Sequence, residues 1–165
     1  MKSFHSIDGS IVAPLGFLTA GLFCDVKRLG TGKGSNKGQK RDLAVIVSEV
    51  PATAAGMFTT NQICAAPVKV CVDHIADGKA QAVVINSGNA NACTGPRGLK
   101  DAREMAALLA EELLLQPEDV LVGSTGRIGL ELPMPNIRAG IRQIVKELDD
   151  APTAAHHAAE AIMNM

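Results

Sequence analysis

The chain has 165 residues, a length that fits one domain, and its 47% hydrophobic and 20% charged residues exclude general disorder. The formal net charge of -1 and the absence of Trp and Tyr argue against a nucleic-acid partner, which needs a basic surface or stacking aromatics. No apolar run reaches the ~20 residues of a membrane span, and no secretory signal follows Met1. We therefore expect a single cytoplasmic domain over residues 1–165, with neither membrane nor nucleic acid as partner.

The first half of the chain predicts strands. Short apolar runs rich in β-branched residues and bounded by turn residues cover 20–26, 42–50, 54–59, 67–72 and 80–86. The gap between the first two runs predicts a hairpin with a long, flexible, basic tip over 30–38. This tip does not match a phosphate-binding loop, because Gly34 rather than Ser or Thr follows Lys33.

After Asn86 the spacing of apolar residues becomes helical. A helix is predicted over 96–114, a short strand over 120–123, a helix from Pro133 to about residue 148, and an Ala-rich helix over 153–163. Strands that come first and helices that come later predict an α+β sandwich. Within it, the strand at 80–86, the helix and the strand at 120–123 can form one βαβ unit.

The cysteines and histidines predict neither a disulfide framework nor a metal site. Cys24, Cys64, Cys71 and Cys93 form no C-x-x-C pair and lie in apolar or turn contexts typical of reduced thiols. His156 and His157 are adjacent, so on a helix they point about 100° apart and cannot share a metal ion.

Two turns are candidates for chemistry. The turn over 86–95 is rich in Asn and Gly and joins a strand to a helix, so it is either a structural turn or a site for a carboxylate or carbonyl. Ser87 lacks the frame of a nucleophile elbow, and no nearby His or Asp would activate Ser87 or Cys93. The turn over 123–126 can aim one hydroxyl and one N–H at the same point, as an oxyanion hole requires, or it can be a capped tight turn.

Several long blocks carry a resemblance to a known family. They are APLGF at 13–17, DLAVI at 42–46, PATAAGMFTTN at 51–61, AAPV at 65–68, VINSGNANACTG at 84–95, STGRIG at 124–129 and AEAIM at 159–163. In these blocks and their order the chain resembles the ornithine acetyltransferases, the bifunctional glutamate N-acetyltransferases of arginine biosynthesis. The resemblance extends over nearly the whole chain.

The resemblance implies an N-terminal-nucleophile-like α/β sandwich made as a precursor that cuts itself before a threonine into an α and a β chain. The freed threonine would take an acetyl group from N-acetylornithine, or from acetyl-CoA as a co-substrate, and pass it to glutamate. No other cofactor and no metal is implied. The oxyanion-stabilising threonine and glycine of the family fall on Thr125 and Gly126. The chain would be an α-chain segment that works in a hetero-oligomer with its β chain.

The chain departs from the family's pattern in four respects. The nucleophilic threonine has no counterpart up to Met165, so the β chain is expected to supply it. The family's Thr-Thr-Asp after Ala-Ile-Met is replaced by Asn164 and Met165, which removes a threonine that helps to hold substrate. Arg127 stands where the family more often has an apolar residue, and the basic tip resembles an insertion.

Two alternative functions remain open at this point. The chain can be a non-catalytic, truncated paralogue or interaction module, which the absent nucleophile favours. It can also be a self-cleaving relative with amidohydrolase or aminopeptidase activity, since such enzymes use a similar Thr or Ser arrangement. Only the motifs shared with the arginine-pathway enzymes argue against this second alternative.

Overall fold

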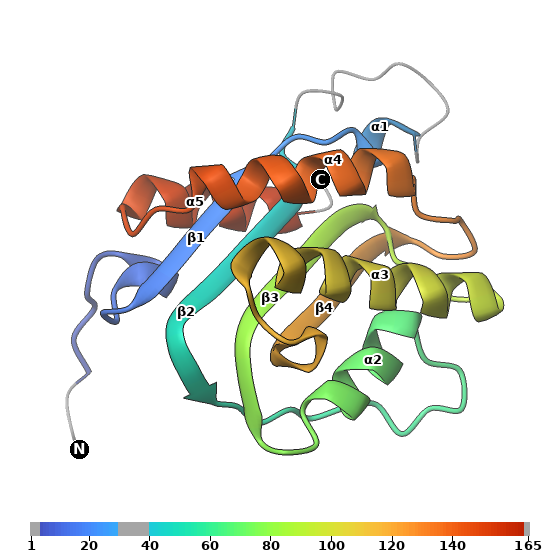
Figure 1. Cartoon of the computed structure of the whole chain (residues 1–165). Coiled ribbons are helices and arrows are strands. Elements are labelled where there is room, and N and C mark those ends of the chain that lie inside the picture. Colours follow the sequence, from blue (N-terminus) through green and yellow to red (C-terminus); the bar gives the residue numbers. More distant parts are fainter. Residues whose placement is uncertain (1–3, 30–39, 164–165) are drawn as a thin grey trace.

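The computed structural model describes residues 4–29 and 40–163, which form a four-stranded mixed sheet flanked by helices (Figure 1). The strands β1 (Phe17–Leu22), β2 (Leu43–Thr53), β3 (Lys79–Asn89) and β4 (Val120–Arg127) lie side by side in that order. The first three strands pair antiparallel, whereas β4 pairs parallel to β3. The predicted α+β fold is therefore confirmed, and so is the predicted βαβ unit.

Helices cover both faces of this sheet. Along the chain they are α1 (Val26–Leu29), α2 (Ala66–His74), α3 (Gly95–Leu113), α4 (Met134–Ile144) and α5 (Pro152–Ile162), with short 3-10 turns η1 (Ser10–Val12), η3 (Pro117–Asp119) and η4 (Val145–Glu147). None of the helices in the described part of the chain is long and apolar enough to cross a membrane.

The main core lies between the sheet and helices α2, α3 and α4. Alternate strand residues such as Val45, Val84 and Val122 belong to one buried cluster with side chains of these helices. The helical members recur every three or four residues, a spacing from which α3 and α4 were predicted. They are Ala66, Val70, Ala102, Met105, Ala106, Leu109, Ala110, Met134, Ile137, Ile141 and Ile144.

Helix α5 covers the opposite face, where it packs mainly on β1 and β2. Ala44 of β2 forms a separate small cluster with Ala158 and Ala161 of α5. The approach is so close that a Cβ at Gly21 would lie 2.1 Å from the carbonyl oxygen of His157. The alanines of α5 and the glycine in β1 thus serve the same purpose, because small residues let the backbones of helix and strand come close together.

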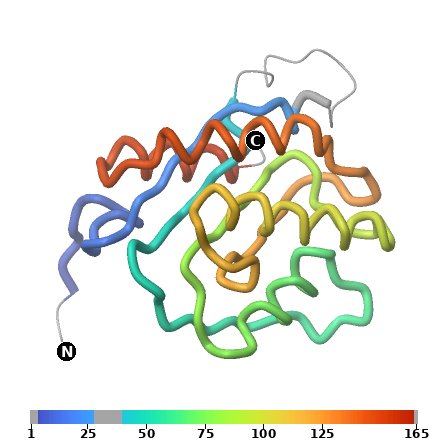
Figure 2. Tube along the Cα trace, in the orientation of Figure 1, coloured from blue at the N-terminus to red at the C-terminus, as the bar shows by residue number. Residues whose placement is uncertain are grey.

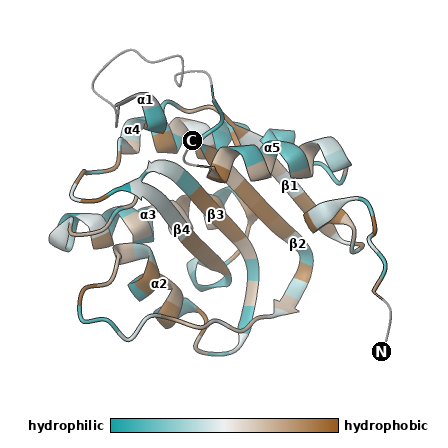
Figure 3. Ribbon diagram, turned by 180° about the vertical axis from the view of Figure 1, so that it is seen from behind, coloured by the Kyte–Doolittle hydropathy of each residue, from teal (hydrophilic) through white to brown (hydrophobic). Residues whose placement is uncertain are grey.

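The same face is open over β3 and β4. Seen from behind, β3 and β4 have no helix over them, and apolar colouring runs across the strands (Figure 3). By the strand register, Ile46, Val83, Ile85 and Leu121 point to this face, and all four are only half-buried. The described part of the chain therefore leaves an apolar sheet surface uncovered next to α5.

The prediction of a strand over 67–72 is wrong, because these residues belong to helix α2. The alternation of Val68, Val70 and Val72 fits a strand, but only Val70 is fully buried and Val72 is 47% exposed. The burial of Ala66 and Val70 follows the four-residue spacing of a helix. Pro67 in the first helical turn was the local signal for a helix start.

Two other strand predictions also need correction. Residues 54–59 form no strand, since the pairing of β2 with β3 ends at Thr53 and the chain then crosses to α2 as an irregular, largely exposed segment (Figure 2). The predicted strand over 20–26 is shifted, because β1 spans Phe17–Leu22 and helix α1 already begins at Val26. β1 and β2 do pair antiparallel, as expected of a hairpin, but the predicted tip over 30–38 lies outside the described residues.

The Asp42 side chain, just before β2, connects this strand with the segment from the end of β1 to α1. Its side chain is fully buried, and its carboxylate accepts backbone hydrogen bonds from Cys24 (2.7 Å), Val26 (2.7 Å) and Lys27 (3.0 Å). A buried carboxylate is tolerated only when such donors replace the water that it has lost. The tight turn between β1 and α1 is therefore folded around this carboxylate.

We predict that Asp42→Asn lowers the free energy of unfolding of the complete protein by about 3 kcal/mol, because the new amide NH₂ would face an N–H donor and leave it unpaired. Urea unfolding monitored by circular dichroism would measure the change. Asp77→Asn is the matched control, since Asp77 is exposed and accepts one bond from Lys79, and it should change stability by less than about 0.5 kcal/mol. Equal effects of the two substitutions would contradict the role given to Asp42.

Candidate functional site

The residues singled out as two turns lie at one edge of the sheet, but the turn prediction needs correction, because 86–89 still belong to strand β3 and 123–126 all belong to strand β4. Because β3 and β4 are parallel, their carboxyl ends lie side by side, with Ser87 opposite Thr125 and Gly88 opposite Gly126. From the sequence alone, these two segments were separate candidates. The structure makes them neighbours, and this edge is our candidate site.

Thr125 is half-buried near the end of β4, on the sheet face that α5 partly covers. Its register partner Ser87 points to the same face and donates a hydrogen bond from Oγ to the carbonyl oxygen of Ala161, in the last turn of α5. The Thr125 side chain therefore lies on the same face as the end of α5. Met163, the last described residue, follows directly, whereas Asn164 and Met165 lie outside the described residues.

Gly126 occupies a position that only glycine can take. Its φ is +129°, and a Cβ there would lie 2.3 Å from the carbonyl group of Gly88. Gly88 has a φ of +120°, and a Cβ on it would lie 2.9 Å from the backbone nitrogen of Lys27. Three backbone segments, from β4, β3 and α1, are thus stacked directly on one another at this edge.

A buried polar network lies beneath this edge. The Ser124 hydroxyl donates to Asn86 Oδ1 over 2.6 Å, and Asn86 Nδ2 donates to the carbonyl oxygen of Asn89 over 2.9 Å. Asn89 Nδ2 in turn donates to the carbonyl oxygen of Glu131, over 2.7 Å. This network was not predicted from the sequence, although three asparagines within six residues beside a strand were a signal of side chains bonded to backbone.

The second half of the Asn-rich turn has a structural role. Thr94 Oγ1 donates to Asn91 Oδ1 over 2.7 Å, and Asn91 Nδ2 donates to the carbonyl oxygen of Gly98 over 2.8 Å. A Cβ at Gly98 would lie 1.8 Å from Thr94 Oγ1, so the glycine makes room for this pair. Hydrogen bonds therefore attach this segment to the first turn of α3.

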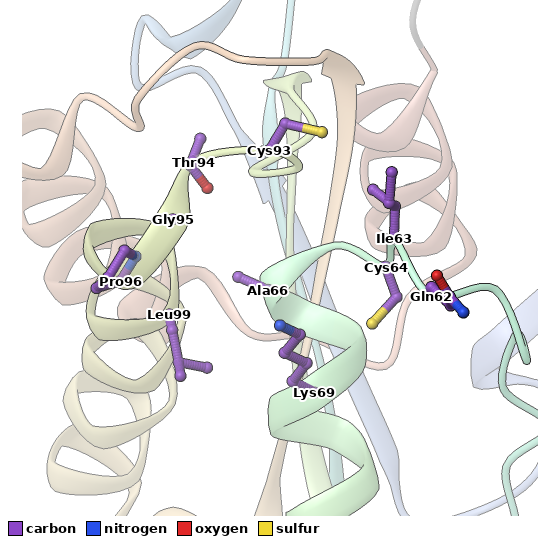
Figure 4. Close-up of a pocket in the computed structure, with 10 residues that line it drawn as sticks. All are labelled: Gln62, Ile63, Cys64, Ala66, Lys69, Cys93, Thr94, Gly95, Pro96 and Leu99. Atoms are coloured by element: carbon purple, nitrogen blue, oxygen red, sulfur yellow. The ribbon is translucent and has the colours of Figure 1, made fainter.

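A pocket of about 490 Å³ lies on the helical side of the sheet, where α2 and α3 begin (Figure 4). Lys69 and two thiols, Cys64 and Cys93, are among its lining residues. Its full lining is Gln62, Ile63, Cys64, Ala66, Lys69, Cys93, Thr94, Gly95, Pro96 and Leu99. Neither Thr125 nor Gly126 lines this pocket, so it is separate from the edge at β4.

The thiols differ in their surroundings. Burial, and then the neighbouring Asp42 carboxylate, raise the pKa of Cys24 far above its usual value. Burial also raises the pKa of Cys71, whose thiol donates to the carbonyl oxygen of Val122. Cys93, in contrast, is exposed. Among residues 4–29 and 40–163, no group of three His, Cys, Asp or Glu side chains is placed to hold a metal ion.

Comparison with known proteins decides the family. The family model for ArgJ matches residues 28–164, which is most of the chain. The chain belongs to the ArgJ family. The resemblance to ornithine acetyltransferases inferred from the sequence blocks is therefore confirmed.

Curated ArgJ relatives match along nearly the whole chain. The arginine biosynthesis bifunctional protein ArgJ of Symbiobacterium thermophilum is 48% identical over 155 residues, and that of Bacillus anthracis is 49% identical over 157 residues. In both cases the match covers 94% of this chain but 36% of the relative. The chain thus spans about a third of the length of these ArgJ proteins.

Two solved ArgJ-family structures share the fold. The ArgJ protein of Bacillus halodurans superposes with a TM-score of 0.84 at 44% identity, covering 93% of this chain and 75% of that chain. The ornithine acetyltransferase of Mycobacterium tuberculosis, solved with ornithine, also gives a TM-score of 0.84, at 37% identity, covering 94% of this chain and 79% of that chain.

We predict that iodoacetamide at about pH 8 modifies Cys93 in the folded protein but leaves Cys24 and Cys71 unmodified. The thiolate is the reacting form, and burial of Cys24 and Cys71 keeps their thiols protonated. Peptide mass spectrometry after alkylation measures each site, and the unfolded protein is the control in which all three react. Rapid alkylation of Cys24 in the folded protein would contradict the enclosure of its thiol.

Proposed function

We propose that the complete protein is an acetyltransferase of arginine biosynthesis, which moves an acetyl group from N-acetylornithine, or from acetyl-CoA, to glutamate. An acetyl-threonine intermediate on the β chain would carry the group. In this proposal the present chain supplies the oxyanion hole through Thr125 and Gly126. Membership of the ArgJ family and the names of its relatives support the reaction class.

The observation that carries the proposal is the geometry at the end of β4. An oxyanion hole needs donors on a rigid support aimed at one point where negative charge develops. Thr125 offers a hydroxyl and Gly126 a backbone N–H, and these adjacent residues sit on a strand end that is stacked against Gly88. Since Gly126 is exposed and has no side chain, a substrate carbonyl can approach the backbone there.

The reaction proceeds in two displacements. The threonine oxygen attacks the acetyl carbonyl and gives up its proton to the α-amine of the same threonine. The carbonyl oxygen becomes an anion that Thr125 and Gly126 stabilise, and collapse of the tetrahedral intermediate breaks the bond to the ornithine nitrogen, which takes the proton. The amine of glutamate then attacks the acetyl-threonine ester by the same steps and frees the threonine.

We also propose that the remainder of the protein packs on the open sheet face. This face carries the apolar side chains Ile46, Val83, Ile85 and Leu121, and exposed apolar surface of this kind favours a partner. The chain covers 36% of a curated relative but 75% of a solved chain, so the solved chain is roughly half as long as the relative. A precursor divided into two chains accounts for this difference.

We predict that Thr125→Ala in the complete protein lowers the rate of acetyl transfer by ~10²–10³ and leaves substrate affinity much less affected, because one donor to the developing charge is lost. Thr125→Ser keeps a hydroxyl and should retain most of the rate. Steady-state kinetics beside melting temperatures measure both effects. A lowered melting temperature with near-normal turnover in Thr125→Ala would show that Thr125 is a structural cap instead.

We further predict that residues 1–165 alone transfer no acetyl group from N-acetylornithine to glutamate, because an oxyanion hole without a positioned nucleophile has nothing to stabilise. The assay compares this chain, purified from a host without its own enzyme, with the complete protein. Acetyl transfer by the isolated chain above the background of a mock purification would show that this chain does not need a nucleophile from the β chain.

A further inference from the structure

The buried amide of Asn86 connects the two strands at the candidate site. Asn86 is fully buried, and burying a primary amide in a core costs free energy unless its polar groups are hydrogen-bonded. Both ends of this amide have partners, since Oδ1 accepts from Ser124 and Nδ2 donates to the backbone of Asn89. An apolar residue of similar size would fill the same space without needing hydrogen-bond partners. The amide therefore has a role beyond filling the core.

The partners of Asn86 lie on either side of Gly126. Ser124 directly precedes Thr125 in β4, so its hydrogen bond holds the strand at the residue before Thr125 and Gly126. On the other side, the backbone nitrogen of Asn89 is one of the atoms nearest to Gly126, 2.9 Å from the position that a Cβ there would take. One amide thus holds both β4 just before Thr125 and the β3 backbone against which Gly126 packs.

This edge needs support beyond the strand ladder. Within the described residues, β4 is the outer strand of the sheet and pairs with β3 alone. At the last pairs of this ladder, Gly88 and Gly126 both have positive φ and no side chain, so little in the two residues themselves restricts the backbone. The ends of edge strands are also where pairing is weakest.

We propose that Ser124 and Asn86 are positioning residues, which hold Thr125 and Gly126 in the geometry for oxyanion stabilisation. This inference rests on the proposed function of Thr125 and Gly126. Neither Ser124 nor Asn86 touches the substrate, because their side chains lie on the helical face of the sheet, opposite to Thr125. They act on the reaction through the backbone of β4, where a displacement of about 1 Å is enough to cost a large part of the rate.

The test is Ser124→Ala in the complete protein, with Ser48→Ala as the matched control. Ser48 is another strand serine whose hydroxyl makes one short hydrogen bond, to the carbonyl oxygen of Val50 over 2.7 Å, but it lies in β2. The fraction of enzyme that becomes acetylated by N-acetylornithine in the absence of glutamate is measured by mass spectrometry. Turnover is then expressed per competent site, so that a loss of folded protein does not count as a loss of rate.

We expect Ser124→Ala to lower kcat per competent site about tenfold, with the KM for N-acetylornithine within about twofold of the parent value. Ser48→Ala should change stability by a similar amount and leave kcat per competent site unchanged. Ser124→Thr keeps the hydroxyl donor and should restore most of the rate. Asn86→Asp, which keeps the acceptor for Ser124 but loses the donor to Asn89, should also lower kcat.

Two results would overturn the inference in distinguishable ways. If Ser124→Ala and Ser48→Ala have the same kcat per competent site while Thr125→Ala is slow, the network is structural and only the positioning role fails. If Thr125→Ala retains the parent rate, the oxyanion role fails, and the positioning role fails with it. If Ser124→Ala does not yield folded protein, Asn86→Asp takes its place. The same kcat per competent site in Asn86→Asp and Ser48→Ala would then show that the network is structural, and a lower kcat in Asn86→Asp would support the positioning role.

Discussion

The hydrogen bonds made by Asp42 are the constraint on which the rest of the structure depends. Besides its three side-chain bonds, its backbone N–H donates to Leu22 at the end of β1, and its carbonyl oxygen accepts from Ser87 in β3. One residue therefore joins the end of β1, the start of α1 and the middle of the sheet. Since Lys27 of α1 lies directly against Gly88, the position of the candidate site also follows from the turn that Asp42 holds.

The sequence predicted the helices better than the strands, for physical reasons. Helices α3, α4 and α5 each have a proline at the start and apolar residues at helical spacing, and these local signals agree with the tertiary packing. In α2 the alternating valines predicted a strand, whereas the proline indicated a helix start. The structure has a helix there, with Val70 buried against the sheet. Such burial depends on distant residues and is not visible in a short window.

The candidate site was predicted in part. The hydroxyl of Thr125 and the glycine at 126 are readable from the residue types, and the family resemblance singled out the same two positions. What the residues alone could not supply is the pairing of Thr125 and Gly126 with Ser87 and Gly88, because it depends on the parallel register of two strands separated by a helix. The hydrogen bond from Ser124 to Asn86 is likewise a contact across this register, between residues 38 positions apart in the sequence.

The close packing of Gly21 against His157 has a consequence for the synthesis of the protein. β1 is made near the beginning of the chain, whereas its cover α5 lies near the end of the described residues. Backbone pairing of Thr19 with Asp149 spans the same interval. Contacts of such long separation form late, because the intervening loop must be closed first. While the ribosome adds the residues between them, this edge strand stays without its cover, and a chaperone that binds exposed strands would act during that interval.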